Sequence, residues 1–178
     1  MKALAYRTQT LIHRPPEEVF QFCSDLRSEL QWNPKAKYVD KLTDGPVGVG
    51  TRYRARWATS GPTTVEVVAF DRPHRWETTA TARGMSIRFH GVVTDAGPGA
   101  RYSACLELHP EGLAWLVAPL ALLAMRCQDQ QNMRRIREAL ESSAVTPDGG
   151  GWSRPVDGER PEVLGCGGAA SRLPIGHA

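Results

Sequence analysis

The segment from His13 to Pro34 restricts the possible folds of this chain more than any other part of the sequence. Pro15 and Pro16 fix backbone angles near helical values and lack the N–H groups that a first turn leaves unpaired, so they predict a helix start. A second short helix is predicted to end before Pro34. One apolar stripe at helical spacing contains Val19, Phe22, Cys23 and Leu26. Two helices of this length cannot form a core alone, so they need a sheet to pack against.

The middle of the chain predicts a series of strands joined by tight turns. The clearest alternation lies in residues 51–58, where three arginines alternate with Tyr53, Ala55 and Trp57, so the two sets lie on opposite faces. Turn signals recur there at a spacing of about 8–12 residues, which indicates an antiparallel sheet. We expect strands over residues 4–12, 38–42, 51–58, 63–70, 74–81, 85–94 and 101–109.

A long helix is predicted from Gly112 to about Ser142. Its first half, residues 113–125, is apolar on nearly every side, whereas its second half is amphipathic. The apolar half is too short to span a bilayer, which needs roughly 20 residues. A helix that is apolar all round is expected to be buried or to lie at an interface. Pro119 is expected to kink it.

Composition fits a single globular domain. The 178 residues are 41% hydrophobic and 23% charged, both ordinary values. The net charge of +3 comes from scattered basic residues, so no nucleic-acid partner is expected. The four cysteines are far apart and form no CxxC pair, so we expect no metal and no cofactor. Nothing in the sequence indicates an oligomeric state.

The two ends of the chain differ in character. The first ten residues contain no apolar run typical of a signal peptide, so a cytoplasmic protein is expected. From Val145 onward glycine and proline become frequent, which is typical of disordered sequence. We therefore expect one domain over residues 1–143 and a disordered tail over residues 144–178.

The ordered set of motifs resembles the polyketide cyclase/dehydrase branch of the SRPBCC (START-like) superfamily. The resemblance covers about residues 2–142 and rests on RPPEEVFQFCSDLRSELQWNP, GPVGVGTRYRARW, AFDRPHRW and the helix start LAWLVAPLALLAMR. It implies an α+β helix-grip fold, in which a curved seven-stranded antiparallel sheet surrounds a long C-terminal helix and two short helices lie at the mouth of an apolar cavity. The superfamily includes lipid carriers, aromatase/cyclases, hormone receptors and chaperone activators, so the fold does not determine the function.

Such a cavity would be lined by one face of each strand and closed by the helices. If Tyr53 and Trp57 face inward, the same alternation brings inward-facing residues from the neighbouring strands to the cavity. Large apolar walls with a few polar groups suit a small hydrophobic molecule. The candidate ligand-binding residues are Leu26, Trp32, Tyr53, Trp57, Val67, Trp76, Thr78, Phe89, Tyr102, Leu116 and Leu120.

Three functions remain open from the sequence. The first is non-catalytic binding or transport of a small hydrophobic ligand, which is favoured because no Ser-His-Asp set, H-E-x-x-H motif or phosphate-binding loop is present. The second is an aromatase/cyclase or dehydratase acting on a polyketide-like substrate, with His90 or Tyr102 as the first residue to test for proton transfer. The third is an interaction module that docks residues 113–125 on a protein or a membrane, although membrane contact is not favoured.

Overall fold

The computed structural model describes residues 3–142, except 59 and 83. The elements occur in the order that the sequence predicts: a first strand, a short helical segment, a series of strands and a final helix. They are β1 (Leu4–Ile12), α1 (Pro16–Ser24), η1 (Leu26–Ser28), α2 (Glu29–Trp32), β2 (Ala36–Lys41), β3 (Arg52–Trp57), β4 (Thr63–Asp71), β5 (Arg75–Ala82), β6 (Met85–Asp95), β7 (Ala100–Pro110), η2 (Gly112–Leu116) and α3 (Ala118–Ser142), where η marks a 3₁₀ helix.

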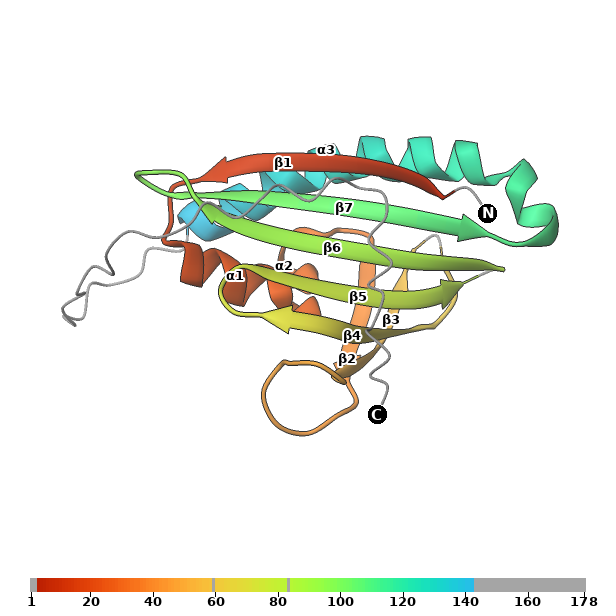
Figure 1. Cartoon of the computed structure of the whole chain (residues 1–178), viewed down its shortest axis with the longest axis horizontal. Coiled ribbons are helices and arrows are strands. Elements are labelled where there is room, and N and C mark those ends of the chain that lie inside the picture. Colours follow the sequence, from red (N-terminus) through yellow and green to blue (C-terminus); the bar gives the residue numbers. More distant parts are fainter. Residues whose placement is uncertain (1–2, 59, 83, 143–178) are drawn as a thin grey trace, which may run out of the picture.

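The strands form one seven-stranded antiparallel sheet in the order β1-β7-β6-β5-β4-β3-β2 (Figure 1). Strands β2 to β7 form a meander in which each pairs with the next along the chain, as the regular turn spacing predicts. The first strand instead joins the last, with Leu4 opposite Leu108 and Ile12 opposite Ala100. The predicted α+β fold class is therefore confirmed.

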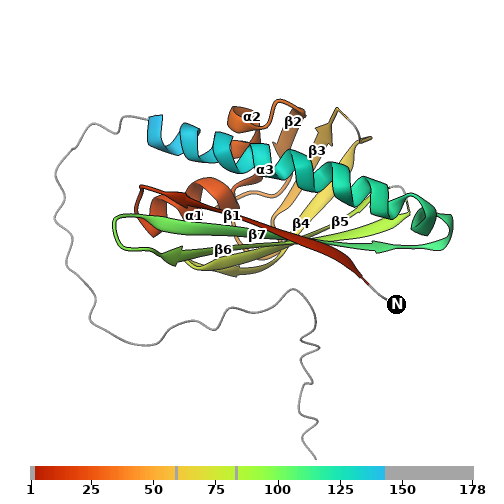
Figure 2. The same cartoon turned by 90° about the horizontal axis from the view of Figure 1, so that it is seen from above.

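All three α-helices lie over the same face of the sheet (Figure 2). The helix α3 runs across β1, and the β2–β3 end of the sheet curves towards it. The helix α1 begins at Pro16, and Glu17 and Glu18 place negative charge at the positive end of its dipole. Because α1 packs between the sheet and the end of α3, it buries Val19 and also Phe20, which lies outside the predicted stripe.

The C-terminal helical region differs from the prediction at its start. It is not one kinked helix: η2 ends at Leu116, Val117 separates the two pieces, and α3 begins at Ala118. Pro119 lies in the first turn of α3, where its missing N–H has no intrahelical partner to lose. The proline therefore starts a helix instead of bending one.

The inward face of α3 follows regular helical spacing from its first residue. Its successive contacts with the sheet, α1 and α2 come from Ala118, Leu122, Met125, Asp129, Asn132, Met133, Ile136 and Leu140. Among the described residues, 3–142 without 59 and 83, no helix is long and apolar enough to cross a membrane. The predicted domain end at residue 143 and the predicted disorder of 144–178 fall outside the described residues.

Candidate ligand-binding cavity

A cavity of about 280 Å³ lies between the inner face of the sheet, the α1–α2 segment and α3. This volume is near the lower end of the roughly 300–1,000 Å³ that small-molecule pockets occupy. The sheet supplies inward-facing residues of β3 to β7, as period-two alternation requires. The described residues that line it are mostly apolar, with Glu29, Lys35 and Asp129 as the only charged side chains among them.

Trp76 and two aromatic residues that contact it, Phe89 and Tyr102, line the cavity, whereas Phe20 packs against Trp76 without lining it. Trp76 stacks on Tyr102 with ring centroids 5.8 Å apart and an interplanar angle of 7°. The rings of Phe20 and Trp76 form a T-shaped pair with centroids 5.4 Å apart at 88°, and the Phe89 centroid lies 6.2 Å from that of Trp76. Trp76 and Tyr102 are each only 3% exposed. Because the rings restrain one another, this aromatic wall is preformed.

Gly91 makes the position of the Trp76 ring possible. It lies directly opposite Trp76 in the β5–β6 pair. A Cβ atom on Gly91 would lie 2.3 to 2.5 Å from three atoms of the indole ring, which is far inside van der Waals contact. Only a glycine at this position lets the tryptophan ring lie flat across the neighbouring strand.

A cluster of hydrogen-bonded side chains that line the cavity is centred on Glu29. Its Oε2 atom accepts hydrogen bonds from Trp57 Nε1 at 2.7 Å and from Asn33 Nδ2 at 2.9 Å. Gln128 of α3 donates to Asn33 Oδ1 at 3.5 Å, so this group connects α2, β3 and α3. Burial raises the pKa of Glu29, the two N–H donors lower it in part, and the negative charge of Asp129 raises it further.

Asp129 is the second carboxyl group of the cavity. It accepts hydrogen bonds from the Tyr6 hydroxyl on Oδ2 and from Asn132 Nδ2 at 3.3 Å on Oδ1. Burial raises the pKa of Asp129, and these two donors offset only part of that rise. Burial also raises the pKa of the Tyr102 hydroxyl and of the Cys23 thiol, so both stay neutral at physiological pH.

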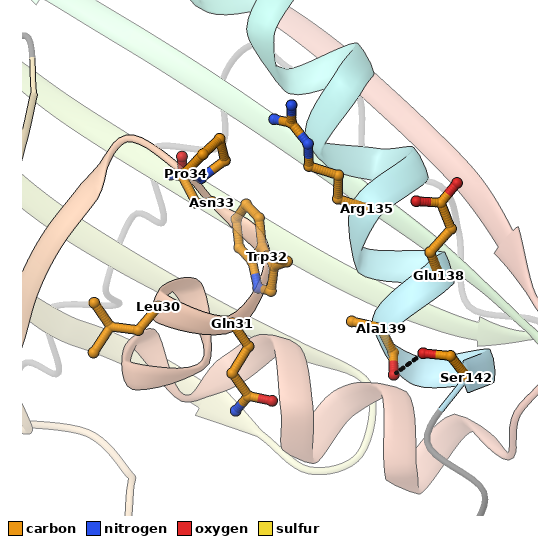
Figure 3. A pocket seen from close by; sticks show the side chains of 9 residues that line it. All are labelled: Leu30, Gln31, Trp32, Asn33, Pro34, Arg135, Glu138, Ala139 and Ser142. Carbon is orange, nitrogen blue, oxygen red and sulfur yellow. Dashed lines mark hydrogen bonds between the residues drawn. The ribbon is translucent and has the colours of Figure 1, made fainter.

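A second hollow, an open groove of about 420 Å³, lies on the outside between α2 and the end of α3 (Figure 3). In Figure 3, Trp32 stands between the α2 side chains and Arg135 of α3. Trp32 and Asn33 line both the groove and the cavity, so they form the wall between the two hollows. The Trp32 Nε1 atom is buried without a hydrogen-bond partner among the described residues.

Most of the residues predicted to bind a ligand do lie together around this cavity. Val67 does not line it: it is fully buried on the same sheet face, but Tyr53, Val65 and the rest of its core cluster enclose it. The predicted residues that line the cavity are Leu26, Trp32, Tyr53, Trp57, Trp76, Thr78, Phe89 and Tyr102.

Leu116 and Leu120, which were also predicted to bind the ligand, do not line the cavity. Their exposed fractions are 80% and 72%. Leu116 belongs to η2, which Val117 separates from α3. Leu120 follows the inward-facing Ala118 by two positions, which is about 200° around a helix with roughly 100° per residue, so it points away from the sheet. Uniform hydrophobicity over residues 113–125 concealed this orientation.

The proton-transfer candidate His90 lies away from the cavity. Its Nδ1 atom is 3.3 Å from Glu77 Oε2, and its Nε2 atom is 3.8 Å from Glu107 Oε1. None of these three residues lines the cavity. Glu29 and Asp129 could not be identified as cavity residues from the sequence, because a glutamate in a short turn and an aspartate in an amphipathic helix look like ordinary solvated residues.

Comparisons with known proteins agree with this architecture. A family model described as polyketide cyclase / dehydrase and lipid transport matches residues 4–141, whereas no curated protein matches the chain. A START superfamily protein from Mycobacterium smegmatis aligns with a TM-score of 0.66 at 14% identity, over 78% of this chain and 97% of that one. The di-domain ARO/CYC BexL from the BE-7585A biosynthetic pathway aligns with a TM-score of 0.64 at 13% identity, over 82% and 51%. Ara h 8.0201 gives 0.63 at 15% identity, over 80% and 100%. At these identities the likeness concerns the fold.

Proposed function

Since the chain belongs to the polyketide cyclase / dehydrase and lipid transport family, we propose that it binds a small, largely apolar molecule in the cavity between the sheet and α3. The observation that carries this proposal is the interior aromatic wall around Trp76 and Tyr102, which borders free volume instead of filling it. A core that served stability alone would be packed to a density that leaves few such voids.

The shape and polarity of the cavity restrict the ligand. The volume of about 280 Å³ suits a compact molecule rather than a long acyl chain. The aromatic rings of Trp76, Phe89 and Tyr102 suit a planar apolar body, and Glu29 can form hydrogen bonds. A ligand with one flat apolar part and one polar end would use both features.

Binding of the neutral fluorescent probe N-phenyl-1-naphthylamine to the full chain tests the proposal. We expect saturable binding with one site per chain. Ala80 lines the cavity, so Ala80→Leu should fill part of it and weaken the probe affinity by roughly tenfold or more. Ala124, which is exposed on α3 and does not line the cavity, provides the matched control Ala124→Leu.

The two variants separate cavity binding from attachment to the surface. Equal affinity in Ala80→Leu and Ala124→Leu would show that the probe binds elsewhere and would contradict the proposal. Native mass spectrometry of protein purified from its own host would then identify any co-purifying molecule. A bound species that Ala80→Leu loses and Ala124→Leu keeps is the result that we expect.

A second candidate function is proton-transfer chemistry on the bound molecule, as in a cyclase or dehydratase. The observation that favours it is a carboxyl group, Glu29, whose pKa is raised inside an apolar cavity. Tyr102 is a weaker candidate because burial raises the pKa of its hydroxyl well above the usual value. If a substrate is found, Glu29→Gln should lower kcat strongly, and an unchanged kcat would contradict this function.

A further inference from the structure

The acidic side chains of the cavity bear on the charge of its ligand. Glu29 comes from α2 and Asp129 from α3, and both line the cavity. The negative charge of Asp129 contributes to the raised pKa of Glu29. Two carboxyl groups therefore share one small, mostly apolar space.

The hydrogen bonds of the two carboxyl groups leave one oxygen available. Asp129 uses both of its oxygens, one for Tyr6 and one for Asn132. Glu29 receives both of its hydrogen bonds, from Trp57 and Asn33, on Oε2. Glu29 Oε1 has no donor among the described residues, so a ligand can supply one.

No positive charge balances these groups within the described part of the chain. Neither Glu29 nor Asp129 forms an ion pair there. Lys35 is the only described basic residue that lines the cavity, and its side chain is exposed. A lysine in that position extends its ammonium group into water, so the interior keeps an excess of acidic groups.

Resting on the function proposed above, we propose that the cavity selects its ligand by charge: it takes an apolar molecule whose polar end is a cationic or neutral hydrogen-bond donor, and it excludes the corresponding carboxylate. Glu29 is the specificity-determining residue. Its Oε1 atom is the acceptor for the donor on the ligand.

The physical reason is the scarcity of water and of cations around the two carboxyl groups. An ammonium group at Oε1 would supply the opposite charge that the cavity lacks and would form a charge-assisted hydrogen bond. A hydroxyl group on the ligand would donate an uncharged hydrogen bond to Oε1. A ligand carboxylate would add a third acidic group where like charges repel and no cation is buried, which opposes binding.

Three probes with the same apolar body test the charge selection. They are 2-(aminomethyl)naphthalene, 2-naphthalenemethanol and 2-naphthoate, used at about pH 8 to displace N-phenyl-1-naphthylamine from the full chain. We expect affinity to fall in that order, with the amine bound roughly tenfold or more tightly than the carboxylate. This ranking is measured on the unmodified protein, so it does not depend on whether a variant folds.

Glu29→Gln then assigns the selection to one residue. Glutamine keeps an oxygen that accepts from Trp57 and Asn33 but removes the negative charge. The ratio of amine affinity to carboxylate affinity should fall by about tenfold. Glu66→Gln, which removes the same charge from an exposed position on β4, should leave the ratio unchanged.

The outcomes distinguish this inference from the proposed function. If N-phenyl-1-naphthylamine binds Ala80→Leu as tightly as it binds the unmodified protein, the cavity is not its site and the proposed function fails. If that probe does bind in the cavity but naphthoate displaces it as well as the amine does, charge selection alone is refuted. If Lys35→Ala abolishes naphthoate binding, the exposed ammonium anchors anions, and the inference is also refuted. An equal ratio in Glu29→Gln and Glu66→Gln would remove Glu29 from the specificity.

Discussion

Replacement of Gly91 by alanine tests the aromatic wall of the cavity directly. The new Cβ atom would lie 2.3 Å from the nearest atom of the Trp76 ring, whereas carbon atoms prefer about 3.5–4.0 Å. The indole ring would therefore have to move by roughly 1 Å or more. Tyr102 stacks on this ring and Phe20 packs against it nearly at a right angle, so the ring cannot move without disturbing other buried side chains.

The expected change in stability follows from two opposing effects. Overpacking a core costs about 1–3 kcal/mol. Replacing glycine by alanine lowers the conformational entropy of the unfolded chain, which stabilises the folded state by roughly 0.4–1 kcal/mol. The net loss in the free energy of unfolding should therefore lie between about 0 and 2.6 kcal/mol, with a central value of about 1.3 kcal/mol. Urea denaturation at an unchanged m-value would measure it, and the displaced ring should also weaken N-phenyl-1-naphthylamine binding.

Two further variants of this protein make the prediction refutable. A Cβ on Gly48 would meet nothing within 4 Å, so Gly48→Ala should not destabilise the protein. In the double variant Gly91→Ala/Trp76→Leu the smaller side chain removes the clash, so the two substitutions should cost less together than the sum of their separate effects. If Gly91→Ala is as stable as Gly48→Ala and binds the probe normally, Trp76 does not lie across Gly91 and the described wall is wrong.

Four other substitutions have definite expected outcomes. Because burial raises the pKa of Glu29, the folded state binds the proton of this carboxyl group more tightly than the unfolded state does. The stability that this proton adds is complete below the unfolded pKa of about 4.3, and it is lost as pH rises through the higher pKa of the folded state. Glu29→Gln should therefore flatten the decline of the unfolding free energy with rising pH, and an unchanged slope in urea titrations would contradict this. Trp32→Ala opens the wall between groove and cavity, so stopped-flow measurements should show faster association and faster dissociation of the probe; equal rates would place the entrance elsewhere. Leu120→Ser should change stability by at most about 0.5 kcal/mol, whereas Ile136→Ala should lose about 2–5 kcal/mol in thermal unfolding; similar losses would contradict the orientation of α3.

The sheet could be predicted from the sequence because its signals are local. Alternation in residues 51–58 correctly placed Tyr53 and Trp57 on the inner face, and each tight turn marked the end of a strand. The start of α3 could not be predicted in the same way. Hydrophobicity in residues 113–125 has no preferred side, so only packing against the sheet determines that Ala118 faces inward and Leu120 outward.

The polar part of the cavity was also beyond sequence reasoning. Glu29 and Trp57 lie far apart in the chain, and their hydrogen bond exists only because α2 lies beside the end of β3. Asp129 is one of several polar residues on its helix and is distinguished only by the inward side of α3. Apolar lining residues could be predicted from periodicity, whereas the residues proposed to recognise a polar ligand required the tertiary arrangement.

The pairing of β1 with β7 also has a consequence for the order of folding. Strands β2 to β7 pair with sequence neighbours, so their contacts can form early and with little loss of chain entropy. The first strand must wait for the last, because Leu4 lies opposite Leu108, and the inward face of α3 follows later still. During synthesis the inner face of the meander is therefore exposed to solvent, and to other chains, until nearly the whole domain has left the ribosome. The cavity is thus among the last features to form.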